Sequence, residues 1–271
     1  LATSVGLSLT TPLLFAALRF VVTAAFILVI PRPRVGWRAL FAIGVSIGVG
    51  QHAGIFLGMA HGVTPGMAAL LAHTQSFFTL GLAWIVFGER LSPRSIVAFA
   101  LAFAGLALLI VERGAPMPLA AILMVLGGAI TAALGNLVLR RLGGVNPLGV
   151  TAWMSVIAAP GLLTLSLAIE GPAPVLAVLQ NWNPTLLLAM GYSGVLAGLV
   201  AYAIWVRLFG RYRAHQVAPF MLLVPIGAIA LSALFLGERL SAWRVGAAAA
   251  ILVGLALNAT GRRAQPRAGA R

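Results

Sequence analysis

The stretch Phe87-Gly-Glu-Arg-Leu-Ser92 returns as Leu236-Gly-Glu-Arg-Leu-Ser241, 149 residues further along the chain. Gly105 and Gly254 repeat the same interval, and each hexapeptide lies between two long apolar stretches. Similarity at a fixed interval is the sign of a duplicated structural unit. The stretch therefore predicts a chain built from two copies of one unit.

The N-terminal parts of the two copies align at a different interval. Pro12-Leu13 corresponds to Pro147-Leu148, at a shift of 135 residues. The difference of 14 residues is about the extra length of the connection 170–183 in the second copy. The same shift places the counterpart of the span that starts near Pro118 before Leu1. We therefore expect five helices per copy, with the first helix of the first copy largely missing from this chain.

Charge is scarce and one-sided in this sequence. Only 8% of the 271 residues are charged, and 61% are apolar, whereas soluble domains carry about 25% charged residues. The sequence has 18 basic residues but only four acidic ones. The basic residues occur in small groups between apolar runs of about 20 residues, the length that crosses a bilayer. This pattern excludes a water-soluble domain and a nucleic-acid-binding surface. It predicts an all-α membrane protein surrounded by the lipid bilayer.

Apolar runs between Arg, Pro and Gly predict nine membrane spans after a short apolar piece at 1–9. Pro172 and Trp182 predict that the connection 170–183 lies at the membrane interface. Residues 1–115 then form the first repeat, 116–260 the second, and 261–271 a basic tail. The predicted spans are 11–30, 37–61, 65–87, 93–111, 118–141, 147–169, 184–208, 214–236 and 242–260.

The distribution of Arg between loops predicts the orientation, because cytoplasmic loops are enriched in basic residues. With a cytoplasmic C-terminus, the outer side holds only Arg19, Arg113, Arg239 and Arg244, and all other Arg residues lie inside. Each repeat has an odd number of spans, so the two repeats are inverted relative to each other. Inverted repeats are typical of secondary transporters. We expect a multi-pass protein of the bacterial inner membrane, acting as a monomer.

The paired Gly-Glu-Arg-Leu-Ser blocks at 88–92 and 237–241 resemble the drug/metabolite transporter superfamily, specifically its EamA-like ten-helix members. The run Tyr202-Ala-Ile-Trp205, followed by 218–225 and Gly237-Glu238, is similar to the second EamA unit. The first unit matches from Pro12 onward, including Arg19-Phe20, although Ser76 stands where the second half has Pro225. The resemblance implies a basket of five plus five helices around a central cavity. It also implies an exporter of amino acids or related metabolites, aromatic amino acids among them.

Polar side chains in the middle of a span are costly and mark candidate sites. Gln51 and His52 lie near the middle of the span 37–61, and His73 and Thr74 lie at a similar depth in the next span, with Phe77 on the same stripe as His73. We predict that these five residues contact substrate. Hydrogen bonding between helices is the alternative for the polar ones.

Arg19 lies about 10 Å into its span at 1.5 Å per residue. Three roles are open for it: snorkelling outward, pairing with the missing first helix, or attracting a substrate carboxylate. The aromatic residues Trp153, Tyr192 and Tyr202 are further substrate-binding candidates. We predict Gly81, Pro225 and Gly227 as hinge points, because Pro removes a backbone hydrogen bond and permits a kink.

The sequence lacks the residue combinations that enzymes use for catalysis. The chain has no Cys and no Asp, and its four His are scattered, which leaves no nucleophile with a base and no metal or cofactor site. The sequence therefore predicts a carrier that exports small metabolites by alternating access. The alternative is a proton-coupled multidrug or cation antiporter, which would need an embedded carboxylate that the visible spans do not contain.

Overall fold

The structure is a computed structural model, which describes residues 2–88, 91–111, 117–181, 183–211, 220, 222–238 and 240–260. Within these ranges every regular element is a helix, which confirms the all-α class. The elements up to residue 110 are α1 (Ala2–Leu9), α2 (Pro12–Ala24), η1 (Ala25–Leu28), α3 (Trp37–Ile43), η2 (Gly44–Gln51), α4 (His52–Ala60), α5 (Pro65–His73), α6 (Gln75–Phe87) and α7 (Pro93–Ile110). The later ones are α8 (Leu119–Leu142), α9 (Pro147–Ile169), α10 (Ala173–Gln180), α11 (Pro184–Gly191), η3 (Tyr192–Val200), α12 (Ala201–Arg211), α14 (Leu223–Leu236) and α15 (Ala242–Thr260).

Six helices in the described ranges are long and apolar enough to cross a membrane. They are Trp37–Ala60, Pro65–Phe87, Pro93–Ile110, Leu119–Leu142, Pro147–Ile169 and Ala242–Ala259. Pro12–Leu28 and Leu223–Leu236 are shorter apolar helices, and Ala173–Gln180 with Pro184–Val200 forms a pair bent by 107°. The predicted spans and the observed helices begin within two residues of one another, except that the described part of the predicted span 214–236 begins its helix only at Leu223.

Proline fixes where many of these helices begin. Pro12, Pro65, Pro93, Pro147 and Pro184 each occupy the first helical turn, where the missing N–H costs nothing. The residue before each proline is Thr, Ser or Asn, which are the side chains that favour helix N-termini. A local pattern of two residues thus sets the start of five spans.

At two of these N-termini a glutamate from the other repeat accepts hydrogen bonds. The Glu170 carboxylate, just after α9, accepts hydrogen bonds from the backbone N–H groups of Leu13 and Leu14 at 2.8 and 3.1 Å and from the Thr11 hydroxyl at 2.7 Å. The Glu238 carboxylate accepts one from the Thr64 hydroxyl, at the start of α5. A carboxylate at a helix N-terminus is stabilised by the free N–H groups there. These two glutamates, the trans-caps, tie the repeats together.

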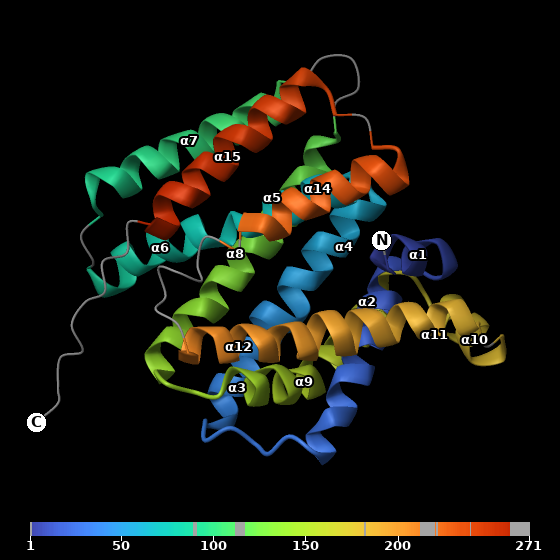
Figure 1. The fold of residues 1–271 in the computed structure, drawn as a ribbon. Coiled ribbons are helices and arrows are strands. Elements are labelled where there is room, and N and C mark those ends of the chain that lie inside the picture. The colour runs from blue at the N-terminus through green and yellow to red at the C-terminus, as the bar shows by residue number, and fades with distance from the viewer. Residues whose placement is uncertain are drawn as a thin grey trace, which may run out of the picture.

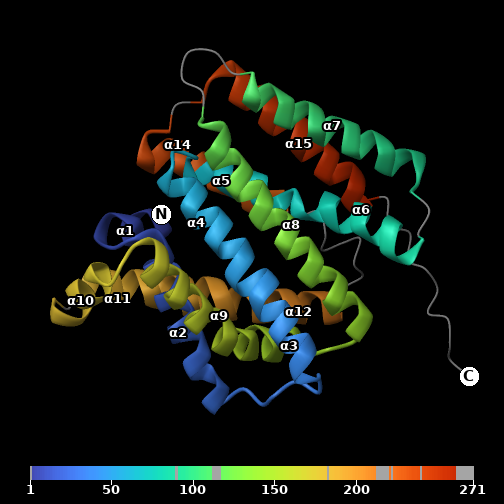
Figure 2. The same cartoon turned by 180° about the vertical axis from the view of Figure 1, so that it is seen from behind.

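The helices α7 and α15 show how the two repeats are related. A β-carbon added at Gly105 would lie 2.7 Å from the Ala247 carbonyl oxygen, and one added at Gly254 would lie 2.7 Å from the Ala98 carbonyl oxygen. Ala98 and Ala247 are themselves 149 residues apart, so exchanging the repeats turns one contact into the other. This exchange requires two antiparallel helices around a local twofold axis, and Figures 1 and 2 show α7 and α15 running antiparallel along one side of the molecule.

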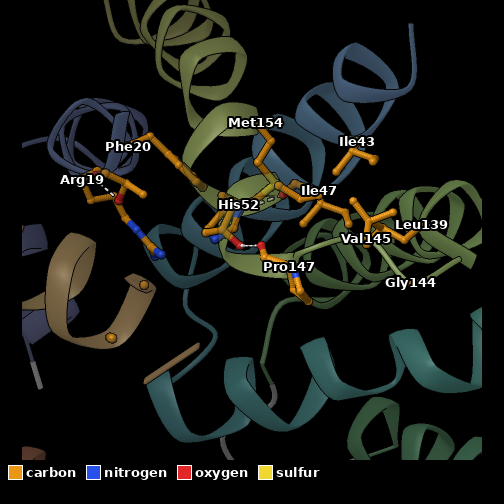
Figure 3. A pocket seen from close by; sticks show the side chains of 15 residues that line it. Arg19, Phe20, Ile43, Ile47, His52, Leu139, Gly144, Val145, Pro147 and Met154 are labelled. Atoms are coloured by element: carbon orange, nitrogen blue, oxygen red, sulfur yellow. Dashed lines mark hydrogen bonds between the residues drawn. The ribbon is translucent and has the colours of Figure 1, made fainter. Parts of the chain in front are cut away.

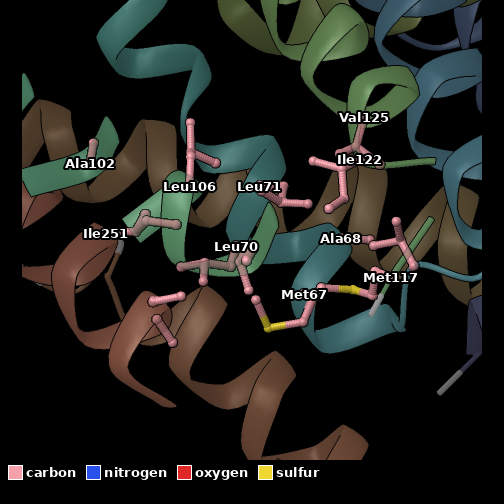
Figure 4. Packing of buried hydrophobic residues seen from close by; sticks show 14 of the residues in the cluster. Met67, Ala68, Leu70, Leu71, Ala102, Leu106, Met117, Ile122, Val125 and Ile251 are labelled. Atoms are coloured by element: carbon pink, nitrogen blue, oxygen red, sulfur yellow. The ribbon is translucent and has the colours of Figure 1, made fainter. Parts of the chain in front are cut away.

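The core also mixes the two repeats. One buried cluster joins α5, α7, α8 and α15, and Figure 4 shows Met67, Leu70 and Leu71 meeting Ile122 and Ile251. A second cluster joins α2, α3, α4, α9 and α11. Each cluster contains residues from both halves of the chain, so the repeats are interlocked and share their cores.

Candidate transport pathway

The first cavity, cavity A, has a volume of about 430 Å³ and lies between α2, η2, α9 and η3 (Figure 3). It reaches the connection between α8 and α9, where Gly144, Val145 and Pro147 line it. Most of its lining is apolar, with Phe20, Ile47 and Met154 as examples whose side chains are drawn in Figure 3. A mostly apolar cavity with a few polar groups is the usual form of a small-molecule site.

The second cavity, cavity B, has a volume of about 540 Å³ and lies between α1, α2, α4, α5 and α14. Met59, Pro65 and Leu236 line it, and these residues stand at the ends of α4 and α14 and at the start of α5.

The two cavities lie toward opposite ends of the helix bundle. Helix α8 runs antiparallel to α3–α4, because Gly58 packs against Ala121 and Val125 while Ile47 packs against Gly135. The end of α8, where cavity A lies, is therefore far from the end of α4, where cavity B lies.

Arg19 and His52 are the two described residues that line both cavities. They stand in α2 and at the start of α4, so the junction between the cavities is built by the first repeat. The Phe20 ring is close to both: its centre is 5.2 Å from the Arg19 guanidinium carbon and 4.7 Å from the His52 ring centre. We call Arg19, Phe20 and His52 the junction triad.

Arg19 is a cation held without a counter-ion. Its Nε is buried without a hydrogen-bond partner, and no carboxylate within the described ranges pairs with the guanidinium. Figure 3 shows the side chain extending from α2 toward the region of His52. A charged group in a membrane interior needs a partner or water, so Arg19 is a group of both cavities that an anion would stabilise.

His52 is held by the backbone of the preceding segment. Its Nδ1 lies 2.9 Å from the Ile47 carbonyl oxygen and 3.1 Å from that of Gly48. Carbonyl oxygens only accept, so we assign the proton to Nδ1. Nε2 is then an unprotonated acceptor. Segment 44–51 is π-helical, and π-helical turns inside α-helices are often found at functional sites.

The other polar candidates from the sequence lie outside both cavities. Gln51 donates from Nε2 to Gln75 Oε1 at 3.4 Å, between η2 and α6. His73 Nδ1 lies 2.7 Å from the Ala69 carbonyl oxygen. Thr74 is 1% exposed and donates to the Leu71 carbonyl oxygen at 2.6 Å. The structure thus separates His52 from Gln51, His73 and Thr74, although all four share a depth in the sequence.

The aromatic candidates are also dispersed. Phe77 is 2% exposed and belongs to the buried cluster around α5 and α7, where it packs against Phe99 with ring centres 5.6 Å apart. Trp153 donates from Nε1 to the Ile30 carbonyl oxygen at 3.0 Å. Tyr192 is 55% exposed at the start of η3. Tyr202 belongs to α12, and its side chain lies outside the described residues.

The three predicted hinge residues have different surroundings. Pro225 is buried and lies in the first turn of α14, which begins at Leu223. A proline in the first turn removes no hydrogen bond from the helix interior. Gly227 lines cavity B, and a β-carbon added to it would have no neighbour within 4 Å. Gly81 lies inside α6, where an added β-carbon would meet only the Phe99 ring at 3.6 Å.

The same family profile matches both halves of the chain. The sequence profile of the EamA-like transporter family matches residues 1–111 and again residues 119–260. The chain belongs to the EamA-like transporter family. It is therefore a multi-pass membrane transporter, and its two repeats are the two EamA units.

Similar proteins support a role in metabolite export. Probable amino-acid metabolite efflux pumps of Salmonella typhimurium (strain LT2) and Escherichia coli (strain K12) are each 33% identical to this EamA-like chain over 266 residues, which covers 96% of the chain and 89% of each relative. An uncharacterized protein of Pseudomonas aeruginosa is 33% identical over 231 residues, 83% of this chain and 73% of the relative. A solved crystal structure matches this chain with a TM-score of 0.64 and 20% sequence identity, over 95% of this chain and 90% of the matched chain. This similarity shows a shared fold.

Several features of this EamA-like structure were missed in the sequence. The π-helical segments 44–51 and 192–200 have no signal in a 3.6-residue pattern, although both hold closely spaced small residues. Phe20, Ala197 and Gly198 line cavity A but are too ordinary to stand out. The Glu170 trans-cap could have been predicted from the sequence. Glu170 is an isolated acidic residue, and the predicted topology places it at the same membrane surface as the helix start Thr11-Pro12.

Proposed function

We propose that this EamA-like protein exports small metabolites of the amino-acid class, with aromatic or other apolar side chains, by alternating access. The observation that carries this proposal is that two cavities toward opposite ends of the bundle share Arg19 and His52. A substrate at the junction triad can be reached from either cavity, which is what alternating access needs. The names of the Salmonella typhimurium and Escherichia coli relatives support the amino-acid class.

A proton-coupled cation antiporter is the alternative, and Arg19 argues against it. An unpaired cation repels a cationic drug at the point where both cavities meet. Glu170 and Glu238, the acidic residues within the described ranges, lie at helix ends as trans-caps. We favour facilitated export down a concentration gradient, with a monomer as the working unit.

The orientation follows from the Arg distribution. We propose that the C-terminus and cavity A face the cytoplasm of a bacterial cell and that cavity B faces the outside, because basic residues are enriched in cytoplasmic loops. Exported metabolites would then enter through cavity A and leave through cavity B.

Transport by purified protein in liposomes tests this function. We expect vesicles that contain the protein to release L-leucine or L-phenylalanine faster than vesicles without protein. Release of tetraphenylphosphonium should be equally fast from both kinds of vesicle. Arg19→Gln should reduce the rate at least 10-fold, whereas Arg34→Gln, at an exposed loop position, should leave it unchanged. Release of the cation with no release of either amino acid would overturn the proposal in favour of the antiporter.

A further inference from the structure

We infer that the junction triad reads both charged ends of a zwitterionic α-amino acid, with Arg19 binding the carboxylate and Nε2 of His52 accepting a hydrogen bond from the ammonium group. The inference rests on the proposed function, because it places one amino-acid substrate at the point shared by both cavities. It adds which protein atom recognises which end of the substrate.

The Arg19 side of the site selects a planar anion. A guanidinium presents several N–H donors in a fixed fork that matches a carboxylate. In this protein none of those donors is used by a carboxylate of the described residues, and Nε is buried without a partner. Binding a carboxylate there would satisfy a group that is costly to leave unpaired.

The His52 side of the site selects a hydrogen-bond donor. Its Nδ1 proton is engaged by the Ile47 and Gly48 carbonyl oxygens, so the ring is fixed in the tautomer whose other nitrogen accepts. No hydrogen-bond partner occupies Nε2 in the described part of the chain. An ammonium group is the donor that complements an imidazole nitrogen beside an apolar wall.

Phe20 sets the distance between the two recognition groups. Its ring centre lies 5.2 Å from the Arg19 guanidinium carbon and 4.7 Å from the His52 ring centre. Both distances end at the same ring centre, so their sum is an upper limit for the separation of the Arg19 guanidinium carbon from the His52 ring centre. This limit is about 10 Å, which one small ligand and its hydrogen bonds can span. In an α-amino acid the nitrogen and the carboxyl carbon are about 2.5 Å apart on one Cα. One such ligand can therefore contact both groups at once.

The apolar lining leaves the side chain of the substrate largely unspecified. Ile47 and Met154 line cavity A beside the triad, and Ile55 and Phe56 line cavity B. These surfaces accept an apolar side chain through burial alone, without a directional contact. Recognition of the shared backbone end of amino acids, together with a permissive apolar wall, predicts a transporter that discriminates poorly among apolar side chains.

Substrate analogues test the inference separately from transport itself. We would measure inhibition of L-leucine counterflow by leucinamide, which lacks the carboxylate, and by 4-methylpentanoate, which lacks the ammonium group. The wild-type protein should bind each analogue at least 10-fold more weakly than L-leucine. L-phenylalanine with its amide and with 3-phenylpropionate provides the same comparison for an aromatic side chain.

Variants assign each end to its residue. Arg19→Gln should remove the preference for L-leucine over leucinamide and keep the preference over 4-methylpentanoate. His52→Asn keeps a donor at the position of Nδ1 but removes the acceptor at Nε2, so it should remove only the preference over 4-methylpentanoate. His61→Asn is the matched control, because His61 also directs Nδ1 to a backbone carbonyl oxygen, at 2.8 Å from Leu57, but lies outside both cavities.

Two outcomes overturn the inference and leave the proposed function standing. In one, L-leucine is transported but either analogue inhibits as strongly as L-leucine itself. In the other, both preferences survive in Arg19→Gln and His52→Asn. If neither amino acid is transported at all, the proposed function fails first. Thermal unfolding of each variant in detergent separates a misfolded protein from one that has lost recognition.

Discussion

A half-buried guanidinium without a counter-ion destabilises the fold that holds it, because the partial desolvation of its charge is not repaid by an ion pair. Arg19 is in this position, and its contact with the Phe20 ring returns only about 0.5–2 kcal/mol. Residues kept at such a cost are often the ones that function requires. Arg19 therefore offers a test in which stability and activity move in opposite directions.

Arg19→Met should raise the free energy of unfolding by about 1–3 kcal/mol, because it replaces an unpaired charge with an apolar side chain of similar length. The same variant should lose at least nine-tenths of its transport rate. Thermal unfolding in detergent and liposome release measure the two effects on one preparation. A variant that is less stable than the wild type would show that Arg19 has a structural partner.

His52 and His73 have the same kind of backbone hydrogen bond but differ in what surrounds the ring. Both direct Nδ1 to a carbonyl oxygen of their own helix, yet of the two only His52 lines the cavities. His73→Leu should lower the free energy of unfolding by about 1 kcal/mol and leave transport per folded molecule unchanged. His52→Leu should abolish transport with a similar change in stability. Equal losses of transport in both variants would place His73 in the pathway as well.

At the scale of the helix, the two π-helical segments occupy equivalent places in the repeats. Segment 44–51, moved by 149 residues, falls within one residue of segment 192–200. Each lies beside cavity A, which Ile47 and Ala197 line. A π-helical turn contains more residues than an α-helical one, so it turns the following side chains away from the faces that a 3.6-residue period assigns. Gln51 ends the first of these segments and His52 begins α4, so the change of helix type falls between the two side chains.

Glycines at helix crossings provide a matched pair for testing the packing of α8. A β-carbon added at Gly128 would lie 2.8 Å from the Gln51 carbonyl oxygen, whereas one added at Gly127 would have no neighbour within 4 Å. Gly128→Ala should therefore destabilise the protein by about 1–3 kcal/mol through overpacking. Gly127→Ala should stabilise it by up to about 1 kcal/mol, because Ala favours helix. Similar melting temperatures for the two variants would mean that α8 does not lie against η2 in this way.

The Glu170 trans-cap should contribute strongly to stability. Its carboxylate also accepts a hydrogen bond from the Ser166 hydroxyl at 2.6 Å, in addition to those from α2 and Thr11. Glu170→Ala should lower the free energy of unfolding by about 2–4 kcal/mol, since several charge-assisted hydrogen bonds are lost together. Glu170→Gln, which keeps one acceptor oxygen, should lose about half as much. An unchanged melting temperature in Glu170→Ala would remove the trans-cap from the fold.

At the scale of the whole molecule, the absence of Cys from the sequence makes the pathway directly accessible to labelling. Val145→Cys in cavity A should react with a membrane-impermeant maleimide added to the cytoplasmic side, and Met59→Cys in cavity B with reagent added outside. Excess L-leucine should raise the labelling rate at one of these positions and lower it at the other, because closing one cavity opens the other. Labelling of both positions from one side would exclude two cavities on opposite sides of the membrane.

The sequence predicted most of the fold because proline, arginine and apolar length act locally. Five spans begin at a proline that the sequence displays, and the repeat predicted the relation between α7 and α15. The site was harder to predict. Arg19 and His52 were among the candidates, but the placement of Thr74 and Phe77 in packed interiors depends on which helices lie against α5 and α6. Those neighbours are far away in the sequence, and the π-helical rotation is a tertiary effect that side-chain spacing does not encode.

The trans-cap at Glu170 has a mechanical consequence for α2. If the N-terminus of α2 is held at Glu170, this end is a fulcrum and the helix is a lever. From Pro12 to Leu28 the lever is about 25 Å long, and Arg19 lies about 10 Å from the fulcrum, at 1.5 Å per residue. A tilt of about 10° would then move the far end by about 4 Å and Arg19 by about 2 Å. A lever pinned at this end can widen cavity A while Arg19 moves less than half as far as the end of the helix.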